Sequence, residues 1–199
     1  MSYKPTTDEV KRLRDDTGAG MLDCRNALVR SGGDFEAATR ELGELGQSRA
    51  AKKNERAANE GSIGSYIHAG GKIGVLIEVN CETDFVARSS RFGDLVKDIA
   101  MHVAAMSPQY VSRADVPADV VAAKREELLK SAPQDKKPEV LERIVEGKLN
   151  KWFEEYVLLD QPFIKNDEQT VGELIGTVVG VLGEKIAVRR FAKFALGEG

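Results

Sequence analysis

The sequence predicts an α+β protein in which a small helical domain precedes a core with a small antiparallel sheet. Helical spacing of apolar residues fills the first 46 positions, strand-like runs are few, and the other helical stripes come in blocks. We therefore expect a helical domain over residues 1–46, a linker over residues 47–61 and an α+β core over residues 62–199.

The first domain shows start and stop signals for three short helices. Thr6 and Glu9 have the spacing of a capping box, and Thr17 to Gly20 breaks the first helix. Gly32-Gly33 ends a second helix, and Asp34 is suited to cap a third. Tight glycine turns between short helices indicate a three-helix bundle.

The linker has no large apolar side chain in its first part. Within 47–60 it carries the two acids Glu55 and Glu60 against four basic residues: Arg49, Lys52, Lys53 and Arg56. A solvated helical face explains this run, and contact with nucleic acid is the alternative. The whole chain has 29 Lys+Arg against 32 Asp+Glu, a net charge of -3, which is not the basic balance of a duplex binder.

The core begins with a hairpin. A loosely alternating segment at residues 63–68 meets a buried-strand run at residues 74–79 across Gly70-Gly71. A last strand is expected over residues 185–196. In a regular strand it would place one set of side chains on one face: Ile186, Val188, Ala192 and Phe194.

Between these strands the period becomes helical. One stripe contains Leu95, Ile99, His102 and Met106, so His102 is expected to be a packed core residue and not a ligand. Pro117 and Pro138 each suit a helix start, and Thr170 suits a helix cap. The last of these helices has glycines at positions 172, 176 and 180, a spacing that allows a neighbouring backbone to approach closely.

Composition excludes several classes of protein. Hydrophobic residues make up 42% and charged residues 31% of 199 residues, as in ordinary globular proteins. No apolar stretch reaches the length of a membrane span, and the first ten residues have no apolar secretory core. Cys24 and Cys81 lie far apart, which fits a reducing, cytoplasmic location. We expect no direct nucleic-acid partner, no membrane partner, no resident metal and no cofactor.

Signatures of catalysis are scarce. The chain contains no phosphate-binding GxxxxGK[ST] loop, no GxSxG and no HExxH, and the glycine-rich run 70–74 precedes a strand instead of opening a helix. Cys81, His68 and Asp84 could form a cysteine hydrolase site near the hairpin. Cys81, however, ends an apolar strand, where a free cysteine usually packs as a small hydrophobe.

The segment 78–88 carries the chain from strand to helix and holds the most distinctive residues. Thr83 or Asp84 is suited to cap the helix at this junction, and Phe85 and Val86 stand beside an acid there. Two interpretations of Phe85 remain open at this point. Either it anchors the protein in a partner's crevice, or it folds back into its own core.

This run, EVNCETDFVAR, closely resembles the signature of the elongation factor Ts family. A second run, LRDDTGAGMLDC at residues 13–24, resembles the amino-terminal module of that family, although Arg25 stands where the family usually has lysine. The order of parts agrees over essentially the whole chain. The chain is similar to the short members, which lack the second core half and the coiled-coil insertion of longer ones.

The resemblance implies a nucleotide exchange factor for elongation factor Tu, without covalent chemistry or cofactor. It implies a ubiquitin-associated-type bundle whose contacts with the Tu partner include Arg14, Met21 and Leu22. It also implies that Thr83, Asp84, Phe85 and Val86 act near the partner's magnesium site, and that strand 185–196 joins two copies in a dimer. An RNA- or ribosome-associated module built on the bundle and the basic linker is the alternative function.

Overall fold

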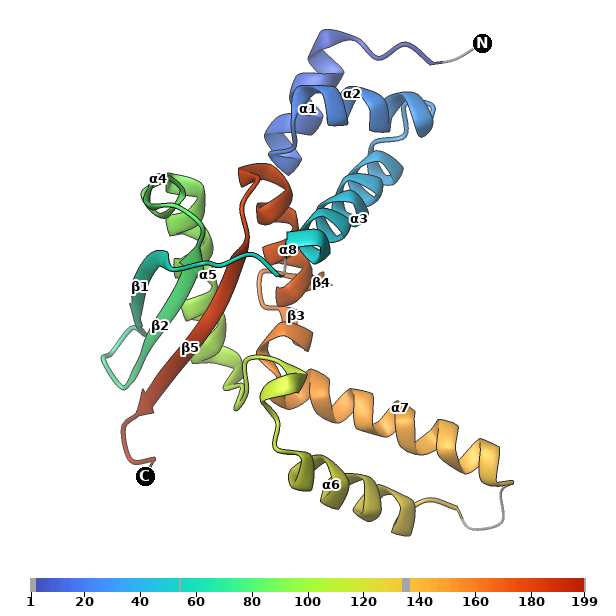
Figure 1. The fold of residues 1–199 in the computed structure, drawn as a ribbon, viewed down its shortest axis with the longest axis vertical. Helices are drawn as coiled ribbons and strands as arrows, with labels where there is room; N and C mark the ends of the chain where they lie inside the picture. The colour runs from blue at the N-terminus through green and yellow to red at the C-terminus, as the bar shows by residue number, and fades with distance from the viewer. Residues whose placement is uncertain (1–2, 54, 134–136, 199) are drawn as a thin grey trace.

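A computed structural model describes residues 3–53, 55–133 and 137–198, without the side chains of residues 50 and 51 (Figure 1). The bundle consists of α1 (Thr7–Thr17), α2 (Met21–Arg30) and α3 (Phe35–Lys53). The predicted capping box is confirmed, because Thr6 Oγ1 accepts the Glu9 N–H at 3.3 Å and the Glu9 carboxylate accepts the Thr6 N–H at 2.6 Å. Asp34 caps α3 through the Ala37 N–H at 3.0 Å.

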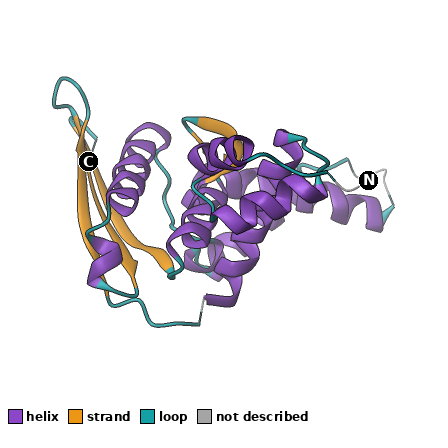
Figure 2. Cartoon of the chain, turned by 90° about the horizontal axis from the view of Figure 1, so that it is seen from above, coloured by secondary structure: helices purple, strands orange, loops and turns teal. Residues whose placement is uncertain are grey.

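The core is built on a three-stranded antiparallel sheet in the order β1 (Glu60–Ile67), β2 (Ile73–Cys81), β5 (Ile186–Ala195). Two helices, α5 (Ser90–Met106) and α8 (Val171–Leu182), supply its apolar cover, and Figure 2 shows a helix lying along the inner face of the sheet. An α+β class is thereby confirmed. None of the described helices is long and apolar enough to cross a membrane.

The predicted face of the last strand is wrong in its second half. Glu78 of β2 pairs with Arg190, but the next residue of β2, Val79, pairs with Val188, so Arg189 is an extra residue in β5. A bulge of one residue reverses the facing of everything beyond it. Phe191 therefore packs on the core, while Phe194 points outward and is 68% exposed.

The third helix continues without a break to Lys53, so the first part of the predicted linker is helical, as expected. Its Gly46 lies against α8: a Cβ on Gly180 would stand 2.9 Å from the Gly46 Cα, and a Cβ on Gly46 would stand 3.1 Å from the Gly176 carbonyl oxygen. The predicted close approach at the α8 glycines is confirmed, and the neighbour is α3. Residues 55–59 then cross to β1 without regular structure.

The segment between α5 and α8 forms a projection that helix-by-helix patterns did not indicate. The helices α6 (Ala118–Lys130) and α7 (Pro138–Tyr156) run antiparallel and extend away from the sheet (Figure 1). They share a small apolar cluster with Val116 and Val157, which adjoin the 3₁₀ segments Arg113–Asp115 and Leu158–Asp160. A short hairpin, β3 (Pro162–Phe163) with β4 (Asn166–Thr170), then leads into α8, which Thr170 caps as predicted.

His102 is a fully buried core residue, as its position in the apolar stripe predicted. Its Nδ1 accepts the Ile164 N–H at 3.2 Å, so its Nε2 carries the proton and donates to Gln161 Oε1 at 2.9 Å. Burial lowers the pKa of His102, which favours this neutral form. The pair ties α5 to the β3–β4 hairpin.

The crossing of α3 over α8 is sensitive to a single methyl group. We expect Gly180→Ala to lower the free energy of unfolding by about 1–3 kcal/mol, because two backbones must separate to admit the new Cβ. Gly147→Ala is the matched control, since a Cβ there meets nothing within 4 Å, and it should be neutral or stabilising by up to about 1 kcal/mol. Urea unfolding measures both, and equal effects at the two glycines would contradict the crossing.

Candidate functional site

The segment Thr83–Val86, here called the TDFV turn, opens the one-turn helix α4 (Asp84–Ala87) at the end of β2. Thr83 is its N-cap, and its Oγ1 accepts the Val86 N–H at 3.4 Å. Successive residues of the turn point in opposite directions: Val86 is 4% exposed in the core, whereas Phe85 is 82% exposed. Of the two interpretations of Phe85, the structure supports the outward one.

A carboxylate distant in sequence holds the TDFV turn in place. Glu184, in the turn between α8 and β5, accepts the Thr83 N–H at 2.9 Å and the Thr83 hydroxyl at 2.6 Å. One side chain thus satisfies the two donors of the helix cap. These two hydrogen bonds help to fix the position of Phe85, because Phe85 is the second residue after Thr83.

The neighbouring acid makes the converse contact. Glu82 accepts the Lys185 N–H at 2.6 Å and pairs with Arg56 at 3.3 Å. The Lys185 N–H is the main cause that lowers the pKa of Glu82, and Arg56 lowers it further against the opposing effect of burial. The end of β2 and the start of β5 are therefore joined by two carboxylates. Each carboxylate accepts the backbone N–H of the residue that follows the other glutamate.

Asp84 is the charged group that the turn shows to solvent. Its side chain is 61% exposed and pairs with Arg88 at 2.9 Å, one helical turn later. An aspartate in the first turn of a helix is also favoured by the helix dipole. The turn consequently presents an exposed aromatic ring beside an exposed carboxylate.

The structure does not assemble the cysteine hydrolase site. Cys81 pairs with Glu60, whereas His68 follows Ile67 at the other end of the hairpin, about 26 Å away at ~3.3 Å per residue. The Cys81 thiol is buried and donates to the Thr83 carbonyl at 3.1 Å, and burial raises its pKa. Among the described residues no group of His, Cys, Asp and Glu is arranged to hold a metal ion.

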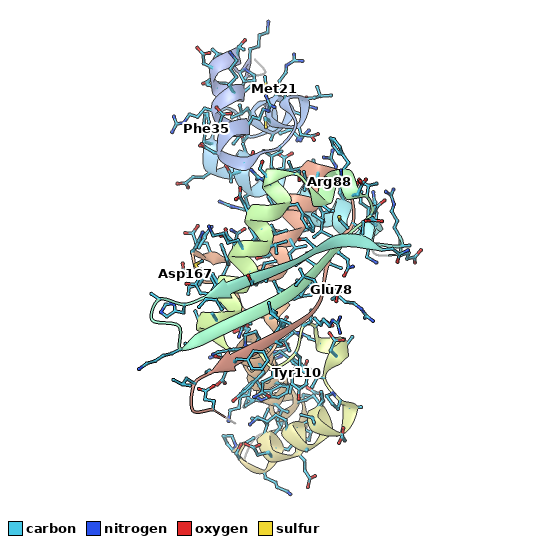
Figure 3. All side chains as sticks on the ribbon, turned by 90° about the vertical axis from the view of Figure 1, so that its left-hand side faces the viewer. Met21, Phe35, Glu78, Arg88, Tyr110 and Asp167 are labelled. Carbon is cyan, nitrogen blue, oxygen red and sulfur yellow. The ribbon has the colours of Figure 1, made fainter. Side chains whose placement is uncertain are left out.

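The residues predicted in the bundle form a second, separate surface. Arg14 is exposed in the last turn of α1, and Met21 and Leu22 open α2 with exposed fractions of 39% and 65%. Figure 3 shows Met21 in the bundle and Arg88 on the neighbouring end of the core. The three residues are thus exposed on the bundle, whereas the TDFV turn belongs to the core.

The basic residues of the linker are largely committed to contacts within the chain. Arg49 forms two hydrogen bonds with Asp23, at 2.8 and 3.2 Å, and Arg56 pairs with Glu82. Burial lowers the pKa of Lys53, with Arg56 as a further cause. This arrangement does not favour a phosphate-binding patch, because such patches leave their cations free for phosphates.

Glu184, Glu82 and Arg56 were missed by sequence reasoning as supports of the site. Glu184 is 101 positions from the threonine that it holds. No spacing rule connects two residues so far apart. The only local signal was Gly183, which marks the turn between α8 and β5.

Comparison with known proteins identifies the family of this chain. Residues 32–198 match the family model Elongation factor TS. Elongation factor Ts of Anaeromyxobacter sp. (strain Fw109-5) is 58% identical over 96% of this chain and 87% of its own length. The factors of Geobacter sulfurreducens and Caldanaerobacter subterraneus are each 51% identical, over 98% and 96% of this chain and 90% and 96% of their own lengths.

These matches show a translation elongation factor. The chain belongs to the elongation factor Ts family, as its two sequence signatures predicted.

The contacts of Glu82 make a pH-dependent contribution to stability. A carboxyl group whose pKa is lowered on folding stabilises the protein above its unfolded pKa of about 4.3, and this contribution is lost as the pH falls through the folded pKa. Glu82→Gln should therefore be destabilised relative to the wild type at pH 7, and the difference should shrink below about pH 4.3.

Urea unfolding at a series of pH values measures this difference. Glu154→Gln, an exposed glutamate of α7, is the control. A difference for Glu82→Gln that stays constant over the whole range would contradict the role of the charge.

Proposed function

We propose that this chain is a cytoplasmic guanine-nucleotide exchange factor for elongation factor Tu. It binds the GDP form, promotes release of GDP by disturbing the magnesium and phosphate site, and is displaced by GTP. The observation that carries the proposal is the exposed Phe85, 82% accessible on a turn that Glu184 holds. Membership of the elongation factor Ts family supports it.

The proposed activity requires no bond to be made or broken. A GTPase holds GDP largely through its phosphates and Mg²⁺. A protein that stabilises a partner conformation in which these ligands no longer converge lowers the affinity for GDP. By linkage, nucleotide lowers the affinity for the exchange factor by the same factor, so GTP in excess expels it.

Energies indicate that two surfaces must act together. Accelerating GDP release by about 10⁴-fold requires about 5.5 kcal/mol, because each tenfold change in rate corresponds to roughly 1.36 kcal/mol. Burial of one phenylalanine side chain supplies about 1.5–3 kcal/mol. Phe85 alone falls short, and contacts of the bundle through Arg14, Met21 and Leu22 have to contribute the remainder.

The geometry supports a division of roles within the TDFV turn. Phe85 is the wedge, and the exposed carboxylate of Asp84 perturbs the surroundings of the partner's metal. Thr83 caps the turn and takes the grip of Glu184. Val86 is buried, so its role in binding is indirect: it fastens the turn to the core.

Removing the ring should slow the release step itself. Phe85→Ala should lower the rate of GDP release at saturating factor by about tenfold or more. The reason is that burial of the ring in the partner, about 1.5–3 kcal/mol, no longer stabilises the state from which GDP leaves. Stopped-flow release of fluorescent GDP from elongation factor Tu measures it. Ile164→Ala, an exposed apolar residue in the β3–β4 hairpin, is the control and should be normal.

The bundle variant gives the contrasting result in the same assay. Leu22→Ala should raise the half-saturating concentration by about tenfold, while the saturated rate changes by less than about twofold. A normal saturated rate for Phe85→Ala would reject the wedge. A collapse of the saturated rate for Leu22→Ala with unchanged half-saturation would reject the division of roles.

We further propose that two copies associate through β5. This strand lies at an edge of the three-stranded sheet, and the outer face beside it carries exposed apolar side chains: Ile63, Ile67, Leu76, Phe194 and Leu196. Association of two copies through this region would cover both the strand edge and the apolar face.

Sedimentation tests the dimer. The wild type should sediment as a dimer, and Phe194→Asp should sediment as a monomer because a charge would be buried in the interface. Val140→Asp, which changes a half-exposed valine of α7, should leave the dimer intact. A wild-type chain that stays monomeric as its concentration rises would contradict the proposal.

A further inference from the structure

The side chain of Arg91 connects the core directly to the bundle. Arg91 is the second residue of α5, and its Nη2 donates to the carbonyl oxygen of Thr17, the last residue of α1, at 3.1 Å. The two residues are 74 positions apart. A guanidinium at this place is also favoured by the dipole of α1, whose C-terminal carbonyls lack helical partners.

The chain beneath the guanidinium is shaped to receive it. Gly18 caps α1 with φ +72°, and a Cβ built on it would lie 2.6 Å from Arg91 Nη2 and 2.7 Å from its Cζ. Glycine is favoured at this position by its backbone conformation, and a Cβ here would displace the guanidinium from its present place. Arg91 therefore supplies the donor of this contact, and Thr17 and Gly18 supply the acceptor and the space for the guanidinium.

A cleft lies between the bundle and the core beside the contact of Arg91 with Thr17. A cleft of about 1040 Å³ separates the bundle from α8 and β4, and Arg91 lies at its wall together with Thr17. Among the described residues, the buried apolar cluster of the bundle and that of the core have no member in common. The bond from Arg91 to Thr17 supplies a second point of attachment.

Both ends of this connection lie next to a proposed binding surface. Thr17 stands four residues before Met21, and Arg91 stands six residues after Phe85. The short loop 18–20 leads directly into α2, and Ser89 caps α5 directly after the TDFV turn and Arg88. The Arg91 side chain and the α3–α8 crossing are therefore two connections that help to set the orientation of one surface relative to the other.

We propose that Arg91 is a positioning residue that holds the bundle surface and the TDFV turn at the separation that one partner molecule requires. This inference rests on the proposed exchange function. With the bundle docked, a fixed geometry keeps Phe85 at a high effective concentration at its crevice, and a loose geometry lowers that concentration.

The kinetic test uses Arg91→Ala alone and in combination with Phe85→Ala. Arg91→Ala should lower the saturated rate of GDP release by about tenfold, while the combined variant should release GDP at the same rate as Phe85→Ala. Arg91→Lys should recover part of the rate, since an ammonium can still donate to the carbonyl. Lys97→Ala, an exposed cation on α5, should be normal. An equal loss with and without Phe85 would overturn the proposal.

A second measurement separates this inference from the proposed function. Spin labels on Asp15→Cys in α1 and Asp94→Cys in α5 report the distance between bundle and core in the free protein, and both native cysteines are fully buried from the reagent. The distance distribution should be narrow with Arg91 and broad with Arg91→Ala. An unchanged distance distribution would overturn the positioning role of Arg91. A wild-type chain that does not accelerate GDP release from elongation factor Tu would reject only the exchange function.

Discussion

The contact on which the site depends is the grip of the Glu184 carboxylate on Thr83. Two hydrogen bonds, at 2.9 and 2.6 Å, hold the cap of a helix only one turn long, which would not be stable by itself. The bond from Glu82 to the Lys185 N–H closes the same junction from the other strand. Together these hydrogen bonds fix the end of β2 against the start of β5 and so hold the turn that carries Phe85.

Rigidity is what makes an exposed phenylalanine useful. An exposed ring gains nothing from the hydrophobic effect until a partner covers it, and a turn that is already ordered loses little entropy on binding. Val86 and Phe85 illustrate how the fold separates these tasks. The first is buried and holds the turn, and the second is left free. In the proposed function the bundle adds a second surface, so neither surface has to supply the whole binding energy.

Local signals predicted much of this architecture. The capping residues Thr6 and Thr170, the hairpin and the close approach at Gly180 were all predicted from patterns within a few positions, and the structure has them. The reversal of β5 at Arg189 was missed because a bulge leaves no mark in the alternation of a strand that is half polar. The continuity of α3 with the predicted helical linker was missed because the helix crosses α8 at Gly46 through glycine and backbone, without the large apolar residues that define a stripe.

The supports of the site were beyond sequence reasoning for a different reason. The position of Phe85 beside an acid raised the question of exposure, but only the packing of Val86 against the core answered it. Glu184 and Arg91 act on residues 101 and 74 positions away, and such pairings arise from the tertiary fold. Motifs therefore indicated the residues that are proposed to face the partner, and the structure was needed to identify those that hold them.

The central claim, that the outward ring enters a partner, is tested most directly by crosslinking. Phe85→p-benzoylphenylalanine places a photoreactive group at the tip of the TDFV turn, and the same replacement at Phe194 marks the outer face of the sheet. On illumination with GDP-loaded elongation factor Tu, position 85 should crosslink to the nucleotide-binding domain of that partner, and position 194 should not. Crosslinks from position 85 that form only within the chain, or only to a second copy, would contradict the account.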